Sequence, residues 1–247
     1  APGIAVTYPL TGFSYDPETG RETTPDPITI VPWLPLSLLL ARAVEARAEL
    51  GDGAPRVELA GAWHDTPAFV GALAGRVKRA LALLSPAEHE TVAVLMTAHS
   101  LPRRVAEREP GYLGQLRDTA DAVAAAAGLA DGEWSFCWQS AGHEPGEWMK
   151  PDFADLMPQL AAAGRRSVIV APVQFLADHL EVLYDVDVGA REQAERCRLA
   201  FRRIESLNAD PGLIEALTAV ARRTLLPATG APQPDRNHRD SALTPTP

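Results

Sequence analysis

The feature that most constrains the fold is an alternation of short apolar runs with longer helical segments across the second half of the chain. The runs that predict strands are 92–97, 134–139, 167–173 and 199–204. The segments that predict helices are 113–128, 152–163, 176–186, 190–198 and 211–225. Strands separated by helices of this length form βαβ units, so the pattern predicts an α/β fold built on a parallel sheet.

The part of the chain before this alternation has a different composition. Residues 7–37 are rich in proline and glycine, which favour turns and long loops. The elements expected before residue 92 are a strand at 29–31, a helix at 37–50, a strand at 57–60 and a helix at 66–84. The tail from Pro227 has little apolar surface to bury and is expected to be disordered.

Charge and cysteine content exclude several classes of protein. The 247 residues carry a formal net charge of −9, which argues against nucleic acid or an anionic membrane as the main partner. Cys137 and Cys197 are too few for a disulfide framework, a four-cysteine iron–sulfur cluster or a structural zinc site. No apolar run approaches the ~20 residues of a spanning helix. The composition therefore predicts a cytoplasmic protein without membrane insertion.

Motifs for nucleotide cofactors and hydrolytic triads are absent. The chain has no GxxxxGK[ST] phosphate loop, no GxGxxG after a predicted strand and no GxSxG turn. These classes of site receive little support from the sequence.

Polar residues follow three of the predicted strands at the point where each strand ends. They are His99 and Ser100 after the first strand, Gln139 and Ser140 after the second, and Asp178, His179 and Glu181 after the third. In open parallel sheets, ligands bind outside the carboxyl ends of the strands. We therefore expect all three clusters to open onto one crevice.

The acidic residues of the third cluster allow two interpretations. Glu181 and Asp185 lie four residues apart on one helical face, and Asp178 lies one turn earlier on nearly the same face. This carboxylate ladder could bind a divalent metal. It could equally be a solvated acidic face that begins with Asp178 as the N-cap. In the same way, His99 could be a ligand or a hydrogen-bonded structural residue, and the spacing leaves these alternatives open.

Five stretches, in order along the chain, resemble the ferrochelatase family. They are AHSLPRRV (98–105), GYLGQL (111–116), WQSAGHEPGEWMKPD (138–152), VIVAPVQFLADHLEVLYDVD (168–187) and RIESLNADPGLIEAL (203–217). The match runs from about Gly61 to Thr224. ADHLEVLYD together with WQSAG is most similar to the soluble coproporphyrin III ferrochelatases of Gram-positive-type bacteria.

The resemblance implies two Rossmann-like, chelatase-type half-domains with parallel sheets flanked by helices. The parts expected are an incomplete first half at 1–87 with a returning helix at 203–226, a complete second half at 88–202 and the tail at 227–247. Residues 1–35 do not resemble the family's opening strand or its arginine-rich porphyrin-gripping helices. Gly189 stands where the family's acidic helix carries a further carboxylate.

The resemblance also implies roles for the polar clusters. His99 and Glu181 would face each other across a tetrapyrrole cleft, His99 as metal ligand and proton acceptor and Glu181 as metal ligand or proton relay. Asp185 would be an outer metal-binding acid. The residues expected to contact the porphyrin are Ser100, Gln139, Ser140, Trp148 and His179.

The activity implied is insertion of Fe²⁺ into a porphyrin, with coproporphyrin III as the expected substrate, in haem biosynthesis. No redox cofactor or iron–sulfur cluster would be needed, and the chain is expected to be a monomer. Three alternatives stay open. The first is a relative that inserts cobalt or nickel into another tetrapyrrole, the second is a porphyrin- or haem-binding protein without catalysis, and the third is a partial chain of an ordinary enzyme.

Overall fold

The computed structural model describes residues 62–107, 110–141 and 146–225, together with 14–15, 22–23, 49 and 60. The predicted strand at 29–31 and the predicted disordered tail lie outside the described residues. Of the predicted helix at 37–50 only Glu49 is described, and it is helical. Of the predicted strand at 57–60 only Ala60 is described, and it is not in a strand.

A parallel sheet of four strands lies at the centre of the described part of the chain. The strands are β3 (Val92–His99), β4 (Trp134–Gln139), β5 (Ser167–Pro172) and β6 (Ala200–Arg203). Their order is β4-β3-β5-β6, and every neighbouring pair is parallel. The predicted α/β class is therefore confirmed.

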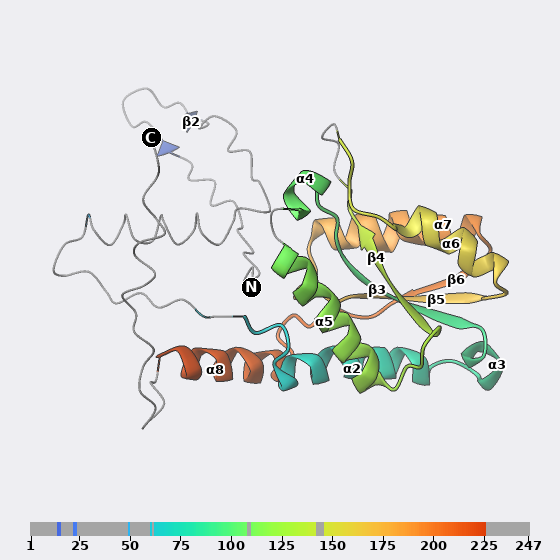
Figure 1. Ribbon diagram of the computed structural model, residues 1–247, viewed down its shortest axis with the longest axis horizontal. Helices are drawn as coiled ribbons and strands as arrows, with labels where there is room; N and C mark the ends of the chain where they lie inside the picture. Colours follow the sequence, from blue (N-terminus) through green and yellow to red (C-terminus); the bar gives the residue numbers. More distant parts are fainter. Residues whose placement is uncertain are drawn as a thin grey trace.

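Both faces of the sheet are covered by helices, which explains the unbroken apolar sequence of its central strands. One face carries α2 (Pro67–Ala82), α5 (Pro110–Ala127) and α8 (Pro211–Leu225), and the other carries α6 (Phe153–Ala162), the π-helix η2 (Val182–Ala190) and α7 (Arg191–Arg196). Figure 1 shows α2 and α8 below the sheet and α6 and α7 above it. Along β3, Val94 and Met96 pack toward the first layer and Leu95 toward the second.

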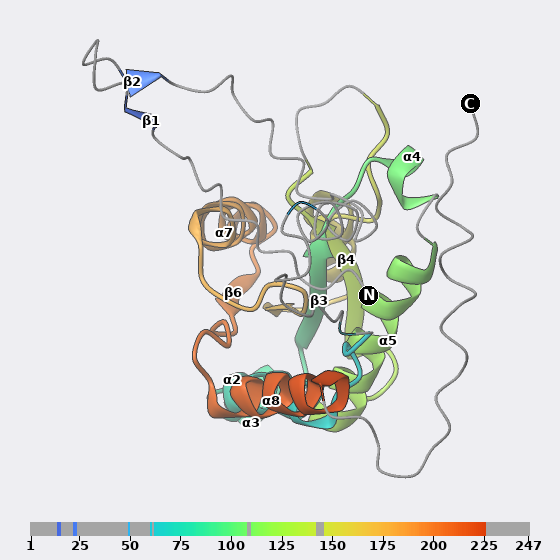
Figure 2. The ribbon, with the colours of Figure 1, turned by 90° about the vertical axis from the view of Figure 1, so that its left-hand side faces the viewer.

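Helix α8 returns to lie beside α2, as Figure 2 shows from the side. Their shared core includes Leu73, Leu213 and Ala216. At Gly212, an added Cβ would come within 3.0 Å of the Cβ of Ala72, so the start of α8 lies close against α2. The division into half-domains stays a prediction, because most of residues 1–87 lie outside the described part.

The remaining described elements are short. They are the antiparallel pair β1 (Ser14–Tyr15) and β2 (Glu22–Thr23), and the helices α3 (Pro86–His89) and α4 (Arg103–Ala106). Helix α3 begins with a capping box in which Ser85 and Glu88 bind each other's backbone N–H groups. Within the described residues, no helix combines the length and the apolar composition that crossing a membrane requires.

Most predicted boundaries lie within about three residues of the observed ones, and two differences affect the candidate site. Strand β3 continues to His99, beyond the predicted end at 97, because His99 still pairs with Gln139 of β4. The helix predicted at 176–186 begins only at Leu180 and passes into η2. The chain before Leu180 is held in a loop, where the backbone N–H of Asp178 donates to the side-chain oxygen of Asn208 at 2.9 Å.

Candidate active site

The centre of the candidate site is a histidine–carboxylate pair at the carboxyl edge of the sheet. His99 is the last residue of β3, and Glu181 directly precedes η2. The distance from Nε2 of His99 to Oε1 of Glu181 is 2.8 Å. The His99 side chain is 16% exposed and that of Glu181 is 39% exposed, so the pair is open to solvent on the glutamate side.

The second ring nitrogen of His99 fixes which atom faces the glutamate. Nδ1 of His99 forms a short contact with the backbone carbonyl oxygen of Ser100. A carbonyl can only accept a hydrogen bond, so Nδ1 carries a hydrogen. Nε2 is then the nitrogen that shares a proton with Glu181, and it is the ring atom available to a metal ion.

The two partners shift each other's pKa in opposite directions. Burial lowers the pKa of His99, but the hydrogen bond and charge of Glu181, the hydrogen bond to the Ser100 carbonyl and the charge of Asp185 together outweigh burial, so the pKa is raised. Burial raises the pKa of Glu181, but the hydrogen bond and charge of His99, with smaller contributions from His179 and Ser140, together outweigh burial and lower it. Each partner therefore favours the charged form of the other, and the proton that they share lies between Nε2 and Oε1.

Two predicted porphyrin-contacting residues, Ser100 and Gln139, are almost fully buried. The hydroxyl of Ser100 donates to the backbone carbonyl of Met149 at 3.2 Å, and its backbone N–H donates to Gln139 at 2.6 Å. The side-chain oxygen of Gln139 accepts from the hydroxyl of Thr97 at 2.6 Å, whereas its Nε2 has no partner among the described residues. Both side chains thus form hydrogen bonds at the ends of β3 and β4, next to His99.

The other three predicted porphyrin-contacting residues are partly exposed. Ser140 adopts a left-handed backbone conformation, with φ of 58°. Its hydroxyl contributes to the lowered pKa of Glu181, although no described group lies within hydrogen-bonding geometry of it. Trp148 pairs with Pro102 through an isolated β-bridge. The ring of His179 lies 5.0 Å from that of Phe175, which in turn lies 6.4 Å from the ring of His99.

The predicted carboxylate ladder is only partly correct. Asp178 is neither on the helical face of Glu181 nor an N-cap, because it precedes the helix and binds Arg203 at 3.0 Å and Ser206 at 2.8 Å. The same guanidinium binds the carboxylate of Asp187 through Nε at 2.7 Å and Nη2 at 3.0 Å. Asp185 remains near the pair, since its charge acts on His99.

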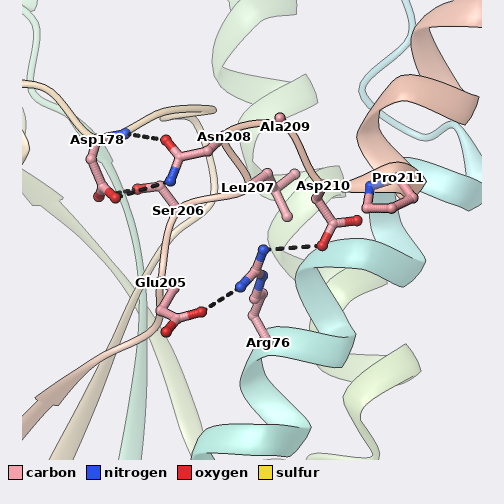
Figure 3. A pocket seen from close by; sticks show the side chains of 9 residues that line it. All are labelled: Arg76, Asp178, Glu205, Ser206, Leu207, Asn208, Ala209, Asp210 and Pro211. Carbon is pink, nitrogen blue, oxygen red and sulfur yellow. Dashed lines mark hydrogen bonds and ion pairs between the residues drawn. The ribbon is translucent and has the colours of Figure 1, made fainter.

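A pocket on the other side of Asp178 does not join this site. Figure 3 shows it between α2 and the segment that leads into α8. Arg76 reaches into the pocket and binds Glu205 at 2.5 Å and Asp210 at 3.0 Å. The charged groups that line this pocket are therefore paired with one another.

The metal ligands that the described residues offer are few. No group of three or more histidine, cysteine, aspartate or glutamate residues in this part of the chain is arranged to hold a metal ion. The pair itself supplies one imidazole nitrogen and one carboxylate, which together suit a first-row transition metal.

The sequence analysis did not identify three side chains whose hydrogen bonds or ion pairs hold this edge of the sheet: Tyr112, Gln174 and Arg203. Gln174 follows β5 at the same carboxyl edge as the predicted clusters, so the rule that located His99 could also have found it. Nothing in the sequence indicates that Arg203, at the end of the edge strand β6, would bind two aspartates.

Comparison with known proteins confirms the resemblance seen in the motifs. A model of the ferrochelatase family matches residues 37–225. The chain is 34% identical over 182 residues to the ferrochelatase of Deinococcus radiodurans, covering 74% of this chain and 58% of that protein. It is 38% identical over 180 residues to the coproporphyrin III ferrochelatase of Geobacillus kaustophilus, covering 72% and 56% of the two chains.

A third relative gives the same result. The coproporphyrin III ferrochelatase of Bacillus subtilis is 37% identical over 164 residues, which cover 66% of this chain and 52% of that protein. The chain thus spans somewhat more than half the length of the curated relatives it matches. The family match and these identities establish that the chain belongs to the ferrochelatase family.

Proposed function

We propose that the chain inserts Fe²⁺ into coproporphyrin III, giving Fe-coproporphyrin in the cytoplasmic synthesis of haem. The observation that carries the proposal is the His99–Glu181 pair, with 2.8 Å between Nε2 and Oε1, at the carboxyl edge of a parallel sheet. The relatives named coproporphyrin III ferrochelatases support the choice of porphyrin.

The pair has the two properties that metal insertion requires. Insertion releases two pyrrole N–H protons and takes Fe²⁺ away from the ligands that carry it. Nε2 of His99 binds the metal after giving up the proton that it shares with Glu181. When the metal moves into the macrocycle, the vacated nitrogen accepts a pyrrole proton.

Glu181 provides the exit for the protons. Its carboxylate is 39% exposed, whereas the His99 side chain is 16% exposed, so a proton on Nε2 reaches solvent through the glutamate. The first pyrrole proton passes by this route, and the second follows once the imidazole is free again. Asp185, on η2, is the next acidic residue along the chain, and its negative charge attracts the protons that leave the pair.

The reaction needs no redox cofactor and no iron–sulfur cluster, because iron stays ferrous while two protons leave. A tetrapyrrole is much larger than the His99–Glu181 pair, so its binding requires further residues. Ser140, Trp148 and His179 are the partly exposed residues of this chain that we expect at its edge.

The test is anaerobic insertion of Fe²⁺ into coproporphyrin III, followed by the change in the Soret band. His99→Ala is the variant, and His89→Ala is the control because His89 is an exposed histidine on α3, away from the sheet edge. The parent and the control should insert iron, and His99→Ala should lose at least about a hundredfold in rate. Full activity in His99→Ala would refute the role of the pair. Porphyrin binding without insertion in the parent would instead support a binding protein.

A further inference from the structure

We propose that Gln174 is a positioning residue that holds His99 in place for metal binding, acting together with Tyr112. This inference rests on the proposed function. Gln174 lies two residues beyond the end of β5. Its side-chain oxygen accepts a hydrogen bond from the backbone N–H of His99 at 2.7 Å, and its side-chain nitrogen donates to the hydroxyl of Tyr112.

The side-chain amide of Gln174 takes the place of a backbone carbonyl of β5, which ends before it can pair with His99. Strand β5 pairs with β3 as far as Thr97 and Pro172, and the N–H of Val173 still donates to the carbonyl of Thr97 at 2.9 Å. Beyond this point the main chain leaves the sheet. The next N–H that β3 directs toward β5 is that of His99, and among the described residues the side chain of Gln174 receives it. A buried N–H without such a partner would be costly.

The hydrogen-bonding capacity of the neighbours fixes the orientation of this amide. The backbone N–H of His99 can only donate, so the oxygen of Gln174 must face it and the nitrogen must face Tyr112. The Tyr112 hydroxyl, on α5, therefore acts as the acceptor. Burial raises the pKa of Tyr112 to about 12, which keeps the hydroxyl neutral. The donor-only N–H of His99 therefore sets the orientation of the amide, and the Tyr112 hydroxyl, which can donate or accept, takes the acceptor role.

This arrangement determines the position of His99 relative to Glu181. On the opposite side of β3, the N–H of Ser100 donates to the carbonyl of Gln139 at 2.6 Å, so the backbone around His99 is held from both neighbouring strands. Gln174 also begins the loop that leads to Glu181, and Phe175 in this loop lies against the ring of His99. One side chain therefore ties the backbone of the imidazole to the segment that carries its carboxylate.

The test uses variants that remove the amide bonds and keep the shape. Gln174→Met is the main variant, and Tyr112→Phe removes only the hydroxyl. Gln159→Met is the control, since Gln159 is an exposed glutamine on α6. The first readout is hydrogen exchange at the amide of His99 by NMR in the metal-free protein. We expect about tenfold faster exchange at His99 in Gln174→Met, with no change at Val94 in the middle of β3.

The second readout is the affinity for Zn²⁺ alone, measured by calorimetry with His99→Ala as the baseline. Gln174→Met should bind Zn²⁺ roughly tenfold more weakly than the parent, Tyr112→Phe should show a smaller loss, and the double variant should resemble Gln174→Met because the two residues act as one unit. In the insertion assay, kcat should fall while KM for the porphyrin stays the same.

Three results would overturn the inference. Unchanged exchange at His99 would show that the bond from Gln174 does not protect it. Faster exchange with unchanged Zn²⁺ affinity would show that Gln174 only ties the strand. If Gln174→Met also loosened Val94, Tyr112→Phe would decide, and parent-like exchange and affinity in that variant would refute the coupling. Exchange and Zn²⁺ binding do not depend on iron insertion, so failure of the proposed function would be seen separately.

Discussion

A metal ion that binds His99 must displace the proton that His99 shares with Glu181, and this exchange makes metal affinity depend on pH. The pKa of His99 is raised above its ordinary value of 6.5. Below the raised pKa each bound metal releases one proton, so the apparent Kd should increase about tenfold for each pH unit of acidification. Above the raised pKa the proton has already left, and the affinity should level off.

Calorimetry with Zn²⁺ measures this exchange without the oxidation that complicates work with Fe²⁺. Titrations at about pH 6 in buffers of different ionisation enthalpy should show roughly one proton released per metal bound. Between about pH 6.5 and pH 5.5 the apparent Kd should rise roughly tenfold. An affinity that stays constant over this interval, with no proton released, would refute the shared-proton description of the pair.

Glu181→Gln separates the glutamate from the general effect of acid. The substitution removes the carboxylate whose hydrogen bond and charge raise the pKa of His99, while burial continues to lower it. The pH at which affinity levels off should therefore move downward, and the affinity above that pH should fall because a ligand is lost. Glu192→Gln, at an exposed position on α7, should change neither quantity. If the pH at which affinity levels off stayed the same in Glu181→Gln, a group other than Glu181 would be raising the pKa of His99.

Two further predictions concern the surroundings of the site. Arg203→Met should lower the free energy of unfolding by about 2–3 kcal/mol in urea titrations. Breaking a fully buried ion pair would cost somewhat more, but the carboxylates of Asp178 and Asp187 that Arg203 binds are 33% and 29% exposed. Arg202→Met, at an exposed position, is the control, and a loss no larger than that of the control would contradict the prediction. In the native protein an alkylating reagent should modify Cys197 and spare Cys137, because burial raises the pKa of the Cys137 thiol. Mass spectrometry of the labelled protein measures this. A fast reaction at Cys137 would contradict the prediction.

The sequence was sufficient to predict the sheet and the place of the pair. The apolar runs of β3 and β5 are buried on both faces, which is the condition under which such runs predict parallel strands. The rule that ligands gather at the carboxyl ends of strands placed His99 and Glu181 near each other, and the resemblance supplied their roles. The distance of 2.8 Å between them required the structure.

The helix that carries Glu181 could not be predicted from the same reasoning. The spacing argument assumed an α-helix from residue 176, in which positions four apart share a face. The chain instead forms η2, whose hydrogen bonds close over five residues, and Asp185 on it still lies near the pair. The helix also starts late, because Asp178 is held by Asn208 and Arg203, which come from distant parts of the sequence.

The strand-end rule could have placed Gln174 at the carboxyl edge, but its hydrogen bond to His99 could not be predicted from the sequence. A glutamine in a loop after a strand has no periodicity that marks it, and its importance arises from where β5 ends relative to β3. That end point is a property of the sheet register. The role of the side chain becomes evident only when the structure shows that the N–H of His99 donates its hydrogen bond to Gln174 and not to β5.

The division of the acidic residues into two sets bears on the proposed binding of a divalent ion. Arg203 binds Asp178 and Asp187, and neither carboxylate is among the groups that shift the pKa of His99. Glu181 and Asp185 remain to act on His99. With His99 protonated, these three groups carry a net charge of −1. Replacing the proton by a divalent ion brings the total to zero, so the metal-bound site avoids the cost of an unbalanced charge in partly buried surroundings. The same balance predicts that Asp185→Asn would weaken metal binding even if Asp185 never contacts the ion, because the loaded site would then carry a net positive charge.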